Sequence, residues 1–275
     1  MNFMEYTSRE HPWKGAMTPF RVLGNTWFVG LSQASTHIID TGDGLIMLDS
    51  GYQESLYLVL ESMRKCGFSP YDIKYIIHSH GHIDHAGATR ALVEMTHAET
   101  FIGEGDREMV NGTRPELTWG PEYNMPFHGF FEPDHLLKDG DKIVLGDTVI
   151  DCVATPGHTP GVFSFFWDIE FEGKRYRAGT MGGAGRNSMT ANYIRKYNLD
   201  PACWRGAFGK SLARCRQEKV DVFIGNHVNQ SNTFERCEKL FAGDRYAFAD
   251  PEAWPKFLDS CQAGLEKLEL EDPLN

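Results

Sequence analysis

Basic residues are scarce in this 275-residue chain, and it has no lysine- or arginine-rich block. The sequence has 27 basic against 38 acidic residues, a formal net charge of −11 at pH 7. A surface of this sign repels phosphate backbones and anionic lipid headgroups. Nucleic acid and membranes are therefore not expected as partners. A small-molecule substrate is expected instead, with a homo-oligomer as an open alternative to a monomer.

Long apolar runs are also missing. No stretch approaches the roughly 18 apolar residues that mark a transmembrane helix, and the first 15 residues show neither an apolar segment nor a small-residue cleavage pattern. These features predict a cytoplasmic location. A periplasmic or secreted location stays open if a signal peptide has been removed.

The six cysteines are scattered, without a Cys-x-x-Cys pair. This excludes a zinc knuckle and a dithiol redox motif. Hydrophobic residues make up 41% and charged residues 24% of the chain, which is ordinary for a globular protein whose core needs no disulfides. Buried free thiols are the prediction.

Short β-rich runs and helical periods alternate along the chain, and the order repeats once. Strands are predicted over 20–23, 26–29, 36–40, 45–48, 73–77, 100–103, 142–145, 148–153, 162–168, 174–178 and 222–224, and helices over 53–65, 86–95, 104–111, 203–217 and 251–268. Two β-then-α halves predict an α/β fold with two sheets packed between helices. No linker divides the chain, so one domain over 1–275 is expected, with residues 1–18 as an N-terminal extension.

Residues 119–133 (WGPEYNMPFHGFFEP) have no regular period and are rich in aromatics, proline and glycine. Loops of this length in a compact domain often cover a site. The segment is predicted to be an ordered active-site loop, with packing against the body of the domain as an equal alternative.

The densest chemical signal lies at 78–85, where HSHGHIDH follows the strand predicted over 73–77. Four histidines and Asp84 within eight residues, at a strand-to-helix loop, predict a metal site. Imidazole and carboxylate suit zinc, with iron or manganese as alternatives, and the absence of cysteine ligands favours a catalytic site. Two further histidines follow predicted strands: His158 in TPGHTPG and His227 in IGNH.

These motifs resemble the metallo-β-lactamase superfamily, whose fold is a four-layer αββα sandwich with metals between the sheets. From about residue 19 to 268 the order is similar to the third subclass of metallo-β-lactamases, through DGLIMLDSG, AGTMGGAG and DVFIGNH. The resemblance implies two zinc ions per chain. It assigns the first to His80, His82 and His158, and the second to Asp84, His85 and His227.

Other residues receive weaker assignments. Asp49, in the turn after an early strand, is a candidate to support a ligand through a hydrogen bond. His78 is expected to belong to the end of its strand, and His37 and His128 are not expected in the pocket although they could reach it. His11, His97 and His135 are expected to be ordinary surface or packed histidines.

The AGTMGGAG segment at 178–185 departs from the glyoxalase-type and lactonase-type members of the family, which are expected to supply an aspartate that bridges two metals, because it has no carboxylate. That absence favours the third-subclass arrangement. In those enzymes the loop carries serines that hold the substrate carboxylate, whereas Thr180 is the only hydroxyl here, so true β-lactamase activity is open. The candidate substrate-binding residues are Thr180, Trp119, Tyr123 and Phe127.

The implied function is hydrolysis, in which a metal-bound hydroxide opens a cyclic amide or ester as in β-lactamases. Asp84 is the catalytic candidate, because it would orient the water and carry its proton. A lactonase- or thioesterase-type hydrolase is the near alternative. An iron-dependent oxidoreductase on the same fold is a rival from another class, and a non-catalytic metal-binding or sensory protein ranks last.

Overall fold

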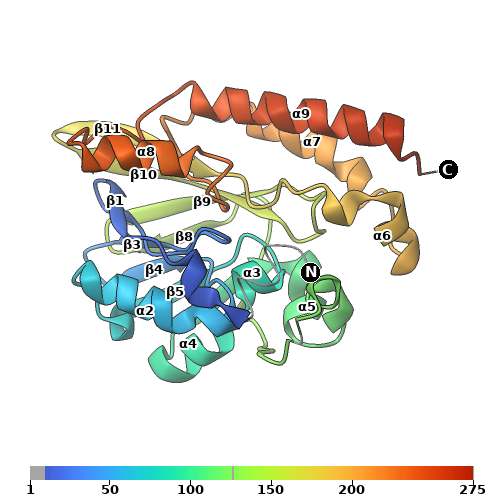
Figure 1. Cartoon of the computed structure of the whole chain (residues 1–275), viewed down its shortest axis with the longest axis horizontal. Helices are drawn as coiled ribbons and strands as arrows, with labels where there is room; N and C mark the ends of the chain where they lie inside the picture. The colour runs from blue at the N-terminus through green and yellow to red at the C-terminus, as the bar shows by residue number, and fades with distance from the viewer. Residues whose placement is uncertain (1–9, 126, 275) are drawn as a thin grey trace.

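In a computed structural model that describes residues 10–125 and 127–274, two β-sheets face each other between outer helices (Figure 1). This arrangement confirms the predicted four-layer order of helix, sheet, sheet and helix. Of the predicted N-terminal extension, residues 1–9 lie outside the described residues, and Pro12–Gly15 form a short 3-10 helix.

The first sheet has seven strands within the described residues, and they neighbour one another in chain order. They are β1 (Phe20–Leu23), β2 (Thr26–Phe28), β3 (His37–Asp40), β4 (Leu45–Leu48), β5 (Ile73–Ile77), β6 (Glu99–Gly103) and β7 (His135–Leu137). Pairing is antiparallel from β1 to β4 and parallel from β4 to β7. The parallel half brings the carboxyl ends of β4, β5 and β6 to one edge of the sheet.

The second sheet has the order β12-β11-β10-β9-β8. Its strands are β8 (Lys142–Leu145), β9 (Thr148–Ala154), β10 (Phe163–Phe171), β11 (Lys174–Thr180) and β12 (Val222–Phe223). The first four pair antiparallel, and β12 lies parallel to β11.

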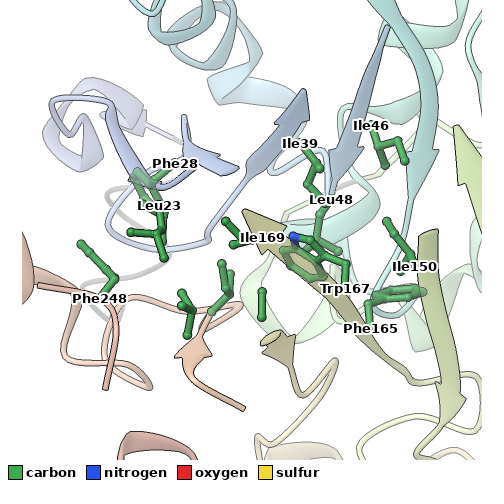
Figure 2. Close-up of a cluster of buried hydrophobic side chains, with 14 of the residues drawn as sticks. Leu23, Phe28, Ile39, Ile46, Leu48, Ile150, Phe165, Trp167, Ile169 and Phe248 are labelled. Atoms are coloured by element: carbon green, nitrogen blue, oxygen red, sulfur yellow. The ribbon is translucent and has the colours of Figure 1, made fainter. Parts of the chain in front are cut away.

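Both faces of the first sheet are buried, and alternate residues face opposite layers. Ile39 of β3 and Leu48 of β4 point between the sheets, where Trp167 of β10 belongs to the same cluster (Figure 2). Ile38 and Met47, one residue earlier on the same strands, belong instead to the cluster under the outer helices. Each large side chain buried in this way contributes about 1.5–3 kcal/mol to folding, so the register of these strands is strongly fixed.

The helices are α2 (Leu56–Lys65), α3 (Ile83–Ala86), α4 (Thr89–Thr96), α5 (Arg107–Val110), α6 (Ala191–Lys196), α7 (Arg205–Cys215), α8 (Thr233–Phe241) and α9 (Ala253–Glu271). Val59 of α2 and Leu92 of α4 pack on the outer face of the first sheet. Phe208 of α7 and Leu258 of α9 pack on the outer face of the second. Figure 1 shows α9 crossing that face with α7 beside it.

Several predicted elements differ in the structure. The helix predicted over 86–95 begins three residues later as α4, and residues 83–86 before it form the separate short helix α3. The prediction missed β7, α6 and α8, which are three, six and nine residues long. Segments this short hold too few repeats for a period to stand out.

No helix among the described residues has the length and apolar character that crossing a bilayer requires. All six cysteines are free thiols, and four of them are buried as predicted: Cys152, Cys215, Cys237 and Cys261. The prediction of burial is wrong for Cys203, which is exposed, and Cys66 is only half-buried.

Candidate metal centre

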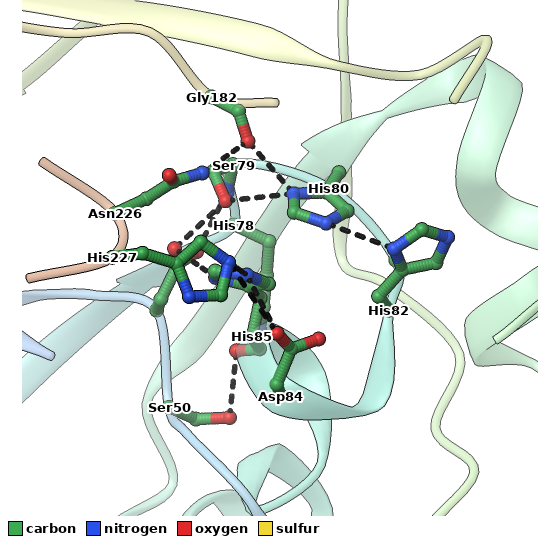
Figure 3. A network of polar contacts seen from close by, with 12 residues as sticks. Ser50, His78, Ser79, His80, His82, Asp84, His85, Gly182, Asn226 and His227 are labelled. Carbon is green, nitrogen blue, oxygen red and sulfur yellow. Dashed lines mark hydrogen bonds and ion pairs between the residues drawn. The ribbon is translucent and has the colours of Figure 1, made fainter. Parts of the chain in front are cut away.

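Three strand ends deliver the predicted ligands to one place. The HSHGHIDH segment begins directly after β5, His158 lies in the loop after β9, and His227 lies four residues beyond β12. Strand ends hold functional groups well because the sheets fix their backbones. Figure 3 shows His80, His82, Asp84, His85 and His227 converging.

Three histidines form the first group. The Nδ1 atom of His82 lies 3.2 Å from Nε2 of His80 and 3.0 Å from Nε2 of His158. All three rings are buried, and one ligand atom from each lies within 4.8 Å of the others. This is the spacing of donors around a single ion.

The second group lies beside the first. The Nε2 atom of His85 is 3.2 Å from Oδ2 of Asp84 and 3.3 Å from Nε2 of His227, and His227 Nε2 is 3.5 Å from the same carboxylate oxygen. His80 also falls within ligand spacing of Asp84 and His85. The two groups are thus adjacent.

The remaining ring nitrogens define the tautomers. Nδ1 of His80, His158 and His227 each lies 2.7 Å from a backbone carbonyl oxygen, of Gly182, Gly185 and Gln33 respectively. A carbonyl oxygen only accepts, so each Nδ1 carries the proton and each Nε2 presents a lone pair to the site. Close approach of lone pairs is repulsive unless a cation lies between them. The donor set therefore fits bound metal ions.

His82 has the opposite orientation, because it turns Nδ1 toward the other two rings. Its Nε2 atom is buried and has no hydrogen-bond partner among the described residues. The ring lies 5.7 Å from that of Trp119, centroid to centroid. His82 is thus held by packing rather than by an acceptor on its outer nitrogen.

The pKa values of the histidines differ between the two groups. Burial and neighbouring histidines lower the pKa of His80 and His82 well below 6.5, and burial lowers that of His158 to about 4. Burial opposes the charged form of His85 as well, but Asp84 and Asp49 outweigh it and raise the pKa to about 10. Without metal, the three histidines of the first group are neutral at pH 7. In the second group both ring nitrogens of His85 are protonated, so this side chain carries a positive charge.

Asp49 lies directly behind the second group and supports two parts of the ligand loop. Its carboxylate accepts hydrogen bonds from the backbone and hydroxyl of Ser79, both at 2.7 Å, and from Nδ1 of His85 at 2.8 Å. Its φ of 58° lies in the left-handed region, which is uncommon for a residue with a side chain and carries a cost of about 1–3 kcal/mol. The network around Asp49 maintains this conformation.

Asp106 is a third buried carboxylate beside the ligand loops, and the sequence pattern did not predict it. It accepts from the backbone N–H groups of Gly81 at 2.8 Å and Gly161 at 2.7 Å, and from the hydroxyl of Thr159 at 2.5 Å. It therefore joins the loop of His80 and His82 to the loop of His158. Burial raises its pKa to about 6 although these three donors oppose the shift. Its position three residues after β6, at the same sheet edge, is the signal that could have identified it.

The glycine-rich segment after β11 provides backbone rather than side-chain groups. The carbonyl oxygen of Gly182 accepts from His80 and also from Nδ2 of Asn226 at 2.7 Å. A Cβ at Gly182 would lie 2.0 Å from the carbonyl oxygen of Phe163, so only glycine allows this approach. No residue from 178 to 185 places a carboxylate near the metal groups.

A cavity of about 920 Å³ opens over the centre and is lined by His80, His82, Asp84, His158 and His227. Trp119 and Tyr123, from the predicted active-site loop, also line it. The other two candidate substrate-binding residues, Phe127 and Thr180, do not line the cavity. The ring centroid of Phe127 lies 4.9 Å from that of Phe130. Thr180 is buried, and its hydroxyl has no hydrogen-bond partner among the described residues.

Of the remaining histidines, His78 links the site to its surroundings, and His37 and His128 lie apart from it. His78 bonds to the carbonyl oxygen of Phe101 and to the hydroxyl of Thr89, so it ties the end of β5 to its neighbours. His37 packs against Phe28 within the first sheet, away from the cavity, and His128 is exposed and outside its lining.

A family model described as "Metallo-beta-lactamase superfamily" matches residues 29–171. Among solved structures, the native FEZ-1 metallo-beta-lactamase from Legionella gormanii matches with a TM-score of 0.85 at 24% identity, over 94% of this chain and 97% of that one. BJP-1, a subclass B3 metallo-beta-lactamase of Bradyrhizobium japonicum, matches with a TM-score of 0.82 at 23% identity, over 96% and 97%. At this identity the likeness establishes the fold.

Curated relatives match over shorter segments. YflN of Bacillus subtilis, named a probable metallo-hydrolase, is 28% identical over 136 residues, 45% of this chain and 51% of the relative. AttM of Agrobacterium fabrum, named an N-acyl homoserine lactonase, is 28% identical over 122 residues, 38% of this chain and 40% of the relative. The matched segments thus span about half the length of these relatives or less.

Proposed function

We propose, from the premise that the chain belongs to the metallo-β-lactamase superfamily, that it is a zinc-dependent hydrolase that opens a cyclic amide or ester. The shared fold and the name of YflN support a metallo-hydrolase. The observation that carries the proposal is the convergence of unprotonated Nε2 atoms, each oriented by an acceptor on its other nitrogen.

The residues fit two ions. His80, His82 and His158 would hold the first, and Asp84, His85 and His227 the second. Imidazole and carboxylate donors without thiolate favour a catalytic zinc site. Bound zinc supplies a water whose pKa is lowered to ~7 and a Lewis acid that polarises a carbonyl oxygen.

Asp84 is the proposed proton carrier. Burial alone would raise its pKa, but His85 and His227 outweigh burial and hold the pKa well below its ordinary value. The carboxylate is therefore ionised across the working range. It borders the cavity, so it can orient the attacking water, accept its proton and deliver it to the leaving nitrogen or oxygen.

The cavity wall provides the other contributions of the chain. Trp119 and Tyr123 line the cavity near His82, and their rings can exclude water around the scissile bond and contact an apolar part of the substrate. The short distances within the ligand set, fixed by Asp49 and Asp106, keep the donors preorganised.

Two alternatives have different support. A lactonase is favoured by the similarity to AttM, but the 178–185 segment lacks the bridging carboxylate that lactonase-type members are expected to supply. An iron-dependent oxidoreductase has less support, because the 178–185 segment offers no carboxylate to bridge two irons.

The test is a hydrolysis panel on the zinc-loaded chain: nitrocefin, an N-acyl homoserine lactone and a thioester. We expect turnover of at least one cyclic amide or ester, loss of turnover with a chelator and recovery with zinc. Iron as the bound metal together with oxygen consumption and no hydrolysis would contradict the proposal.

A further inference from the structure

Asn226 lies between the two ligand groups. It directly precedes His227 of the second group, and its Nδ2 atom donates to the carbonyl oxygen of Gly182 at 2.7 Å. The same oxygen accepts from Nδ1 of His80 of the first group, also at 2.7 Å. Figure 3 shows the two donors reaching this oxygen from different sides. One side chain thus connects both groups through a single backbone carbonyl.

The backbone of Asn226 is held on both sides. Its N–H group donates to the side-chain oxygen of Gln230 at 3.1 Å, and its carbonyl oxygen accepts from the N–H group of Ser35, also at 3.1 Å. The residue is buried. The position of its amide is therefore fixed independently of the contact with Gly182.

The orientation of this amide follows from its partner. A carbonyl oxygen only accepts, so the amide nitrogen must face Gly182. The Oδ1 atom of Asn226 is then buried with no hydrogen-bond partner among the described residues. An unpaired buried acceptor lowers stability, which a small apolar side chain at this position would avoid. A role in the site accounts for the asparagine better than stability does.

The peptide that carries the shared carbonyl joins Gly182 to Gly183. Neither residue has a Cβ atom, so the plane of this peptide can rotate at low cost. A half-turn would replace the oxygen beside His80 by the N–H group of Gly183. Because an N–H group only donates, Nδ1 of His80 would release its proton and Nε2 would take one up, with no change in charge. His80 would then have no lone pair on Nε2 for a metal.

The two hydrogen bonds to the Gly182 oxygen oppose this rotation. The hydroxyl of Ser79 lies 3.1 Å from Nδ1 of His80 and donates to Asp49, so its oxygen can also accept from the histidine. That contact does not hold the Gly182 carbonyl in place. Asn226 holds it whichever nitrogen of His80 carries the proton.

We infer that Asn226 is a positioning residue that fixes the Gly182–Gly183 peptide and thereby the tautomer of His80. With the amide in place, His80 keeps its proton on Nδ1 and presents Nε2 to the first metal site. The inference rests on the proposed function only in taking this centre to bind metal. The tautomer itself is a property of the metal-free chain.

Two substitutions test this role. Asn226→Ala removes the donor, and Asn226→Asp replaces it by an oxygen that repels the carbonyl. ¹⁵N NMR of the chelator-treated full chain at neutral pH reports which ring nitrogen of each histidine carries the proton. We expect His80 in the Nδ1–H form in the unsubstituted chain and a population of the Nε2–H form in both variants. His158 and His227, whose Nδ1 atoms donate to other carbonyls, should keep the Nδ1–H form.

Zinc titration followed by the same spectra reports each site, through His158 for the first and His227 for the second. The affinity of the first site is expected to fall by about 10- to 100-fold in both variants, and that of the second site to fall less. Asn229→Asp is the matched control, because Asn229 is exposed and lies two residues beyond His227. It introduces the same charge and should change neither tautomer nor affinity.

An unchanged His80 tautomer in both variants, a change in all three histidines together, or the same change from Asn229→Asp would overturn the inference. If neither variant folds, hydrogen exchange of the unsubstituted chain decides. The side-chain N–H groups of Asn226 should exchange more slowly than those of Asn229, and equal rates would overturn the inference. Absence of hydrolysis would contradict the proposed function alone, because tautomer and affinity are measured without turnover.

Discussion

The carboxylate of Asp49 accepts a hydrogen bond from Nδ1 of His85 at 2.8 Å, with both side chains fully enclosed. The same carboxylate holds Ser79 by two further bonds. Asp49 thus sets the orientation of a proposed ligand and the path of the loop that carries the others. Because it does not face the cavity, its effect on chemistry is indirect.

Asp49→Asn is expected to weaken metal binding at the second site by about 10- to 100-fold. The amide keeps one acceptor oxygen but cannot accept on its nitrogen, so it cannot satisfy both Ser79 and His85. Competition with a chromogenic chelator measures the affinity. Asp43→Asn, an exposed change of the same type, is the control, and equal affinities in the two variants would contradict this role.

Metal binding is expected to release about one proton at pH 6. The folded metal-free protein keeps His85 protonated up to about pH 10, whereas a metal ligand must be neutral. Asp84 is already ionised and His158 is already neutral at this pH, so neither adds to the release. Zinc titrations by calorimetry in buffers of different ionisation enthalpy count the protons. If metal binding releases no proton, His85 is uncharged before metal binds.

The same raised pKa has a consequence for the stability of the metal-free chain. Because folding raises the pKa of His85, the contribution of its proton is complete below the unfolded value of about 6.5 and is lost as pH rises toward 10. Urea unfolding of the chelator-treated chain should therefore give a lower free energy of unfolding at pH 9.5 than at pH 6.5. In the His85→Gln variant the difference between the two pH values should be smaller. An equal fall in both proteins would assign the pH dependence to other groups.

Asp106→Ala is expected to lower the free energy of unfolding by about 3 kcal/mol or more. The change leaves the N–H groups of Gly81 and Gly161 and the Thr159 hydroxyl without their acceptor, and each buried donor left unpaired costs about 1–3 kcal/mol. Urea denaturation measures the loss. A change below 1 kcal/mol would mean that water or another acceptor replaces the carboxylate.

Asp84→Ala is expected to lower hydrolysis and to weaken the second metal site together, since one carboxylate is proposed to perform both roles. Measuring turnover at saturating zinc, with bound metal counted in the same sample, separates them. Unchanged turnover in a variant that holds both ions would remove Asp84 from proton transfer.

The sequence pattern predicts the layered fold and the position of the histidine cluster because both depend on local spacing. Ile38 and Ile39 alternate between layers as a strand requires, and HSHGHIDH concentrates its donors in one loop. Asp106 escaped prediction because its role comes from contacts across the fold. Asp106 accepts a hydrogen bond from Gly161, 55 positions away in the chain.

The proposed hydrolysis depends on two zinc ions bound in this centre. Elemental analysis of the purified chain is paired with nitrocefin and lactone turnover in the same preparation. We expect close to two zinc ions per chain, activity that disappears when a chelator removes them, and activity that returns with zinc. A fully zinc-loaded chain that cleaves no amide, ester or thioester, or one that binds no zinc, would contradict it.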